Sequence, residues 1–185
     1  WVFHSLFKPF EQTSSSATPL LQSPVTETIK EKDGELYIFK NENIASNNDA
    51  GGIKIVNYSV ENNSWSTSSQ IVKPRSSSSI PTNFGRSFEF CRDFLIIGWR
   101  DNGDPTGGTN HSSVQWSGKV EVWKHNGASY EKVQDIYPNT PVNSGYFGER
   151  ISAYDDMFIV GKNTNHPIQI YKLNSDKTSF IEHST

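Results

Sequence analysis

The sequence has few cysteines and no long apolar run. Cys91 is the single cysteine among 185 residues, which excludes both a disulfide within the chain and a zinc site built from several cysteines. No segment approaches the roughly 18 to 20 consecutive apolar residues that a helix needs to cross a bilayer. The formal net charge is only −3, so electrostatics gives no reason to expect binding to nucleic acid or to an anionic membrane.

Motifs of the common enzyme classes are also missing. The sequence contains no Gly-x-Ser-x-Gly nucleophile motif, no Walker phosphate loop and no His-Glu-x-x-His metalloprotease motif. The histidines show no spacing typical of metal ligands and are interpreted as surface side chains. They are His4, His111, His125, His166 and His183. These gaps disfavour an enzyme, although scattered residues could still form a catalytic centre.

A repeated segment is the strongest pattern that the chain does contain. Each copy runs from a Phe-Gly pair to an Asp, four apolar residues and a closing Gly. The copies begin at Phe84-Gly85 and Phe147-Gly148, 63 residues apart, and end at Gly98 and Gly161. A repeat of this length indicates structural units that stack on one another.

Four strands are expected in each unit. In the best copy they lie at about residues 86–90, 94–99, 119–124 and 130–137. The second strand is apolar at every position, as expected where both faces of a sheet are covered, whereas the third and fourth alternate more. Such a sheet cannot bury both faces alone, so the copies must pack against each other. The sequence predicts an all-β fold made of β-propeller blades, each of four antiparallel strands.

Weaker copies extend the repeat toward the N-terminus. Residues 26–83 form a degenerate blade, in which aligning Lys40 with Gly98 gives an offset of 58 residues. Residues 1–25 are expected to be the outer strands of a half blade, and residues 84–146 and 147–185 to be further blades of the same propeller domain. Because the chain starts in the middle of a repeat, we expect it to be a piece of a longer polypeptide.

These elements together resemble the FG-GAP repeat. The resemblance rests on the Phe-Gly turn, the Asp before an apolar strand that ends in Gly, and a Gly-x-Val-x-Val-aromatic strand at residues 118–123, echoed at Ile168-Gln169-Ile170-Tyr171. FG-GAP repeats are the blades of propellers like those of integrin α-subunits. The resemblance implies a propeller of about seven blades, of which this chain supplies about three and a half.

The calcium site of many FG-GAP repeats does not transfer to this chain. Its Asp-x-Asp-x-Asp-Gly loop is replaced by short turns at residues 90–93 and 154–156. These turns have too few oxygen atoms for the six to eight ligands that calcium takes. No metal site and no cofactor are therefore expected. Asp101 and Asp104 could supply oxygen ligands to a cation from another loop, but a tight turn needs the same residues for its dihedral angles alone.

Candidate recognition residues flank that long loop. Trp99 and Trp116 stand on either side of it, and with Asp101 and Asp104 they form a possible recognition loop that stacks on a sugar ring or anchors a partner. The alternative is that Trp99 simply packs on the core. Cys91, next to a cationic neighbour, is either a reactive thiol or an inert packed residue.

Three Asn-x-Ser sequons are possible N-glycosylation sites, at Asn57, Asn62 and Asn110. They slightly favour a secretory route. Together with the resemblance, they predict an extracellular or cell-surface location.

A non-catalytic β-propeller module for protein binding, adhesion or assembly is the favoured functional interpretation. Its partners would be other protein chains, the missing blades of the same polypeptide, or glycans, met by loops 41–50, 101–117 and 162–167. One alternative is a hydrolase-like enzyme whose centre lies outside the chain or on the propeller axis. Another is a structural subunit of a repeating surface assembly. An acid pair converging on the axis would favour the enzyme, and apolar contact with another chain would favour the assembly.

Overall fold

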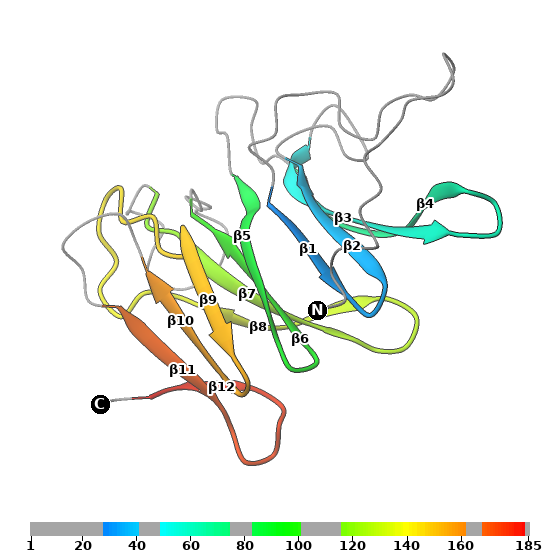
Figure 1. Ribbon diagram of the computed structural model, residues 1–185. Helices are drawn as coiled ribbons and strands as arrows, with labels where there is room; N and C mark the ends of the chain where they lie inside the picture. The colour runs from blue at the N-terminus through cyan, green and yellow to red at the C-terminus, as the bar shows by residue number, and fades with distance from the viewer. Residues whose placement is uncertain (1–27, 41–48, 75–82, 101–115, 162–167, 184–185) are drawn as a thin grey trace, which may run out of the picture.

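The computed structural model describes residues 28–40, 49–74, 83–100, 116–161 and 168–183. Within these ranges it contains twelve strands and no helix, arranged in three four-stranded antiparallel sheets (Figure 1). In each sheet, neighbouring strands follow one another in chain order. The predicted all-β class and the four-stranded antiparallel units are confirmed. A helix able to span a membrane does not occur among the described residues.

Short hairpins begin each sheet. The first sheet consists of β1 (Ile29–Lys32), β2 (Glu35–Lys40), β3 (Asp49–Ser59) and β4 (Ser64–Pro74). Asp33 and Gly34 join β1 to β2 with φ angles of 54° and 83°. A two-residue hairpin turn of this type requires positive φ at both positions, which is why the Asp-Gly pair stands there.

The second and third sheets repeat this arrangement. The second consists of β5 (Phe84–Cys91), β6 (Phe94–Trp99), β7 (Lys119–His125) and β8 (Tyr130–Ile136). The third consists of β9 (Arg150–Tyr154), β10 (Met157–Gly161), β11 (Gln169–Leu173) and β12 (Phe180–Glu182). The strands expected at residues 86–90, 94–99, 119–124 and 130–137 coincide with those of the second sheet to within one or two residues.

The three sheets pack face to face, and β6 contributes to the core on both of its faces. Leu95, Ile97 and Trp99 belong to a cluster shared with the first sheet, whereas Phe94 and Ile96 belong to one shared with the third sheet. All six residues of β6 are buried, which explains why the strand has no polar position.

The expected alternation of β7 is wrong for its first half. Lys119, Val120, Glu121 and Val122 are all buried. The physical reason is that β7, like β6, lies between two neighbouring sheets, so its polar residues are buried as an ion pair instead of facing solvent. Strand β8 is more exposed, with only Ile136 buried.

The Phe-Gly pair is a joint between sheets. Gly148 has a φ of 86°, and a Cβ atom placed on it would lie 2.6 Å from the carbonyl oxygen of Lys119. A Cβ atom on Gly98 would overlap the carbonyl oxygen of Gly148 itself. Gly85 repeats the joint one sheet earlier, with a φ of 87° and Gly52 at 3.3 Å. Glycine is required because two backbones meet without room for side chains.

The register of the degenerate sheet differs by one residue from the sequence alignment. Ile38 pairs with Ile29 as Ile97 pairs with Phe88, so the offset between the first two sheets is 59 and Lys40 aligns with Trp99. An offset of 58 would turn each side chain to the opposite face. The apolar run alone did not determine which face was which.

Candidate functional site

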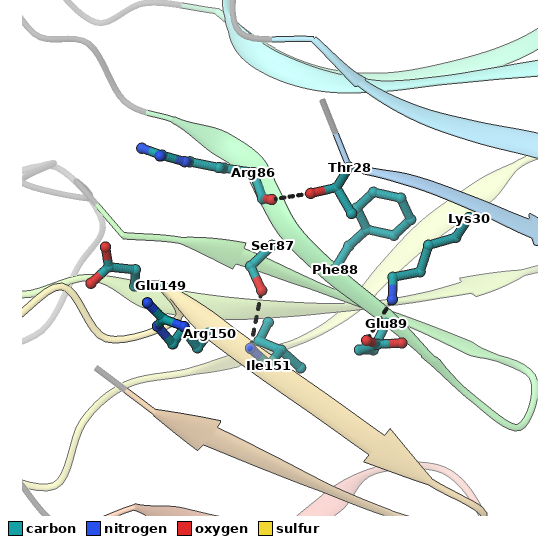
Figure 2. A pocket seen from close by; sticks show the side chains of 9 residues that line it. All are labelled: Thr28, Lys30, Arg86, Ser87, Phe88, Glu89, Glu149, Arg150 and Ile151. Atoms are coloured by element: carbon teal, nitrogen blue, oxygen red, sulfur yellow. Dashed lines mark hydrogen bonds and ion pairs between the residues drawn. The ribbon is translucent and has the colours of Figure 1, made fainter. Parts of the chain in front are cut away.

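A polar pocket of about 400 Å³ lies where the first strands of the three sheets come together (Figure 2). Strands β1, β5 and β9 each contribute to its walls, and several of the lining residues follow directly on a Phe-Gly turn. The lining residues are Thr28, Lys30, Arg86, Ser87, Phe88, Glu89, Glu149, Arg150 and Ile151.

Side-chain hydrogen bonds fix the first strands relative to one another. The hydroxyl of Thr28 donates to the backbone carbonyl of Arg86 at 2.9 Å. The backbone N–H of Ile151 donates to the hydroxyl oxygen of Ser87 at 3.0 Å. The first bond runs from the residue before β1 to β5 and the second from β9 to β5, and both are drawn as dashed lines in Figure 2. Small hydroxyl side chains therefore set the width of the pocket between the sheets.

Each acid of the pocket is engaged by a cation. Glu89 accepts from the Lys30 ammonium at 2.6 Å. Glu149 accepts from the Arg100 guanidinium at 2.8 Å, and that guanidinium also lies 4.6 Å from the ring centre of Tyr146. The second carboxylate oxygen of Glu149 is buried and has no hydrogen-bond partner among the described residues. The two acids come from different sheets, and the structure does not bring them together as a pair sharing a proton.

Two arginines leave the pocket with an excess of positive charge. The side chains of Arg86 and Arg150 are exposed, and within the part of the chain that the structure describes neither guanidinium has a hydrogen-bond or ion-pair partner. In Figure 2 the Arg86 side chain extends away from the carbonyl that binds Thr28. A free guanidinium can bind a carboxylate through two parallel hydrogen bonds. The arrangement is suited to an anionic group.

A second charged cluster is buried in the second sheet, on the side that faces the first. The Lys119 ammonium lies 3.0 Å from both Glu121 and Asp135, and Lys132 lies 2.7 Å from Asp135. Glu121 is fully buried and also accepts from the indole N–H of Trp123. This cluster lies within the packing between sheets and is interpreted as structural.

The ion pairs shift the pKa values of this buried cluster. Burial lowers the pKa of Lys119, but the carboxylates of Glu121 and Asp135 outweigh burial and leave the pKa above its ordinary value. Burial raises the pKa of Asp135, but hydrogen bonds from Lys132 and Lys119 hold it below its ordinary value. Both groups are therefore charged at neutral pH.

The tryptophans of the possible recognition loop have different surroundings. Trp99 is 9% exposed and packs edge-to-face on Phe84, with ring centres 5.5 Å apart. These contacts agree with the alternative that Trp99 packs on the core. Trp116 is half-buried, with a φ of 57°, and its carbonyl accepts from Tyr146 at 2.9 Å. Asp101 and Asp104 lie outside the described residues, so the recognition loop remains a prediction.

Two further predicted sites, Asn57 and Asn62, are not among the residues that line the pocket. Asn57 is half-buried in β3, Asn62 is exposed in the turn before β4, and Asn110 lies outside the described residues; glycosylation of all three stays a prediction. No group of His, Cys, Asp and Glu suited to a metal occurs in the described ranges. The loop surfaces at 41–48, 101–115 and 162–167 are likewise outside them.

Cys91 is buried between the second and third sheets. Its thiol donates to the carbonyl of Asp155 at 3.1 Å. Burial, followed by the nearby carboxylates of Asp156 and Asp155, raises the pKa of Cys91 to about 11, against a lowering effect of Arg92. The thiol is protonated at neutral pH and is a poor nucleophile.

The pocket is not among the sites predicted from the sequence. Arg86 and Arg150 follow the two Phe-Gly turns at neighbouring positions of the repeat. An arginine at the start of two first strands is the sequence feature that could have pointed to the pocket. No protein-family model matches the sequence, and neither does any curated protein. The structure therefore defines a class only: an all-β protein of repeated four-stranded sheets, packed face to face, with a polar pocket where the first strands meet.

Proposed function

We propose that the chain is part of a non-catalytic β-propeller module of the cell surface that binds or assembles with other proteins. Three antiparallel sheets packed in chain order, with their first strands side by side, are typical of propeller blades around an axis (Figure 1). The FG-GAP resemblance adds an expected total of about seven blades. The sequons support the extracellular location.

The charge arrangement of the first-strand pocket is the observation that carries the binding function. Lys30 and Arg100 neutralise the two acids, whereas a hydrolytic centre needs a carboxylate that can exchange a proton with its substrate. Arg86 and Arg150 remain exposed and suited to carboxylates. The pocket therefore favours an acidic segment of a partner protein over a bond to be cleaved.

Binding of a defined acidic probe tests this function. The probe is a short peptide rich in Asp and Glu, compared with the same peptide carrying Asn and Gln. We expect the acidic peptide alone to bind, and its affinity to fall at least about tenfold in Arg86→Ala/Arg150→Ala, because each lost charge-assisted bond is worth about 1.5–3 kcal/mol. Biolayer interferometry at low and at physiological salt measures the affinity.

Lys172→Ala/Lys177→Ala is the matched control. It removes the same number of positive charges from the third sheet and its last turn, at residues that do not line the pocket, and should leave the affinity unchanged. Equal binding by the double arginine variant, or equal binding of the neutral peptide, would contradict the proposed site.

A further inference from the structure

The outer face of the third sheet reproduces a face that is covered in the second sheet. Ile159 pairs with Ile170 across β10 and β11, just as Ile96 pairs with Val122 across β6 and β7. Met157 pairs with Lys172 as Phe94 pairs with Lys124. The third sheet therefore offers, at its end of the stack, the same pattern of side chains to which it is itself attached.

The exposure of these equivalent residues differs sharply. Phe94, Ile96 and Val122 are at most 2% exposed beneath the third sheet. Ile159 is 40% exposed, and Ile181, whose cross-strand partner is Lys172, is 59% exposed on the same face. Apolar side chains of this size are ordinarily buried, and a group of them on one sheet face marks an interaction surface.

Gly161 makes the open face resemble that of the second sheet, where a glycine meets the Phe-Gly turn, more than that of the first sheet, which has Phe39 at this position. The equivalent of Gly161 in the second sheet, Gly98, must lack a side chain because the backbone of Gly148 lies against it. At Gly161 a Cβ atom would meet nothing closer than Arg150 at 3.9 Å, and its φ does not require glycine. Packing among the described residues gives no reason for glycine there. A third Phe-Gly turn, seated on this face, would give one.

A side chain that can donate a hydrogen bond stands at the end of the first strand of each sheet. The ammonium of Lys32 donates to the carbonyl of Arg92 in the second sheet. The thiol of Cys91 donates to the carbonyl of Asp155 in the third sheet. Tyr154 holds the next equivalent position, and its phenol is also a hydrogen-bond donor, here 87% exposed. The contact made twice within the chain has its donor in place a third time.

We propose that this open face, formed by Met157, Ile159, Gly161, Ile170 and Ile181, is the docking site for a further four-stranded sheet led by a Phe-Gly turn. The glycine of that turn seats on Gly161, and the apolar face of that sheet covers Ile159 and Ile170. The inference rests on the repeated-sheet architecture of the proposed function, but it does not involve the arginines of the first-strand pocket.

An extended chain tests the site directly. Residues 137–183 are repeated after residue 183 of the full chain, which supplies the linker, the Phe-Gly turn and the four strands that dock on the second sheet. The readout is the rate at which Ile159→Cys reacts with a maleimide, since Cys91 is fully buried. We expect the rate to fall at least about tenfold in the extended chain, because the maleimide can then reach the cysteine only after the added sheet opens locally.

Two controls make the result specific. Val133→Cys, at a position 45% exposed on β8, should react equally fast in both chains. Gly161→Ala should restore the fast reaction of Ile159→Cys in the extended chain, while leaving the melting temperature of the original chain unchanged.

Each other outcome overturns part of the proposal. Equal rates in the two chains would show that the face does not accept such a sheet. Persistent protection with Gly161→Ala would exclude Gly161 as the seat of the turn. Protection in the original chain that disappears on dilution would assign the face to a second copy instead. Loss of acidic-peptide binding in any of these chains would concern the separate pocket, so the two proposals can fail independently.

Discussion

At the junction of the first and second sheets, charged and phenolic side chains meet. Lys30 pairs with Glu89, and the hydroxyl groups of Tyr37 and Tyr130 lie 2.8 Å apart. Both junctions enclose an apolar cluster. At the junction of the second and third sheets Phe94 packs on Phe180 with ring centres 5.2 Å apart, and Arg100 pairs with Glu149 at the same junction. The two junctions share the repeat geometry and an apolar centre, and they differ in the polar side chains around it: an ammonium–carboxylate pair and two phenols at the first, guanidinium–carboxylate pairs at the second.

This difference shows which part of the repeat is constant. Both junctions keep a Phe-Gly turn against the preceding sheet and a donor from the first strand to the next hairpin turn. The side chains between these fixed points vary freely, as long as they fill the space and satisfy their polar groups. The backbone contact defines the joint, and the side chains set how it responds to salt and pH.

Removing the backbone contact should have the largest effect. Gly98→Ala places a methyl group against the carbonyl of Gly148, and Gly98 cannot move away without disturbing its pairing with Val120. We expect a loss of more than about 4 kcal/mol in the free energy of unfolding. Gly161→Ala, whose Cβ atom would only touch Arg150 at 3.9 Å among the described residues, should change it by less than about 0.5 kcal/mol. Urea unfolding measures both losses, and equal effects would contradict the role of the Gly98–Gly148 backbone contact in joining the sheets.

The second-largest effect should come from breaking the buried ion pairs on the face of the second sheet that packs on the first. Lys119→Met leaves the fully buried Glu121 without its cation, and breaking a buried ion pair from one side costs about 3–5 kcal/mol. Lys30→Met breaks a pair whose side chains are 29% and 25% exposed, so we expect a cost of at most about 1 kcal/mol. Urea midpoints compare the two variants, and similar losses would show that burial does not decide the effect.

Truncation of an apolar side chain in the second junction should have an effect of intermediate size on the free energy of unfolding. Ile96→Ala removes a fully buried side chain and should cost about 2–4 kcal/mol through lost burial and the cavity left behind. Ile159→Ala makes the same change at the exposed equivalent position and should cost less than about 1 kcal/mol. Thermal and urea unfolding of the pair test whether the third sheet covers Ile96.

The smallest expected effect is a pH dependence that arises from the buried cluster of Lys119 and Asp135. The folded-state pKa of Asp135 lies below its unfolded value, so its contribution is fully present above about pH 4 and is lost as the pH falls through the folded value. The pKa of Lys119 is raised, so its contribution persists below about pH 10.5 and is lost only above that. In a plot of the urea midpoint against pH, Asp135→Asn should reduce the fall of the midpoint at acid pH. An unchanged fall would show that Asp135 is not the group responsible.

The sequence predicted the strands well because each sheet is local. Apolar runs, turn residues and the Phe-Gly pairs identified β6 and β10 without any knowledge of contacts, and complete burial of β6 followed from its lack of a polar position. The register of β2 was missed by one residue, because a strand with apolar residues on both faces carries no mark of which face is which.

The pocket could not be predicted for a different reason. Its ion pair joins Lys30 to Glu89, 59 residues apart, and its walls come from three sheets. Which charges meet depends on the packing of one sheet on the next, which the pattern within a single repeat does not specify. The exposed Arg86 and Arg150 became candidates only once their neighbours were known to be paired with others.

The chain-order topology also has a consequence for synthesis. Strand pairing is completed within each sheet by neighbouring segments, whereas the hydrogen bonds between first strands span 58 to 64 residues. Each sheet can thus form from short-range contacts as it leaves the ribosome, and the face it presents waits for the next one. During that interval a nascent chain exposes one apolar sheet face at a time, so translation speed sets how long that face is open to aggregation.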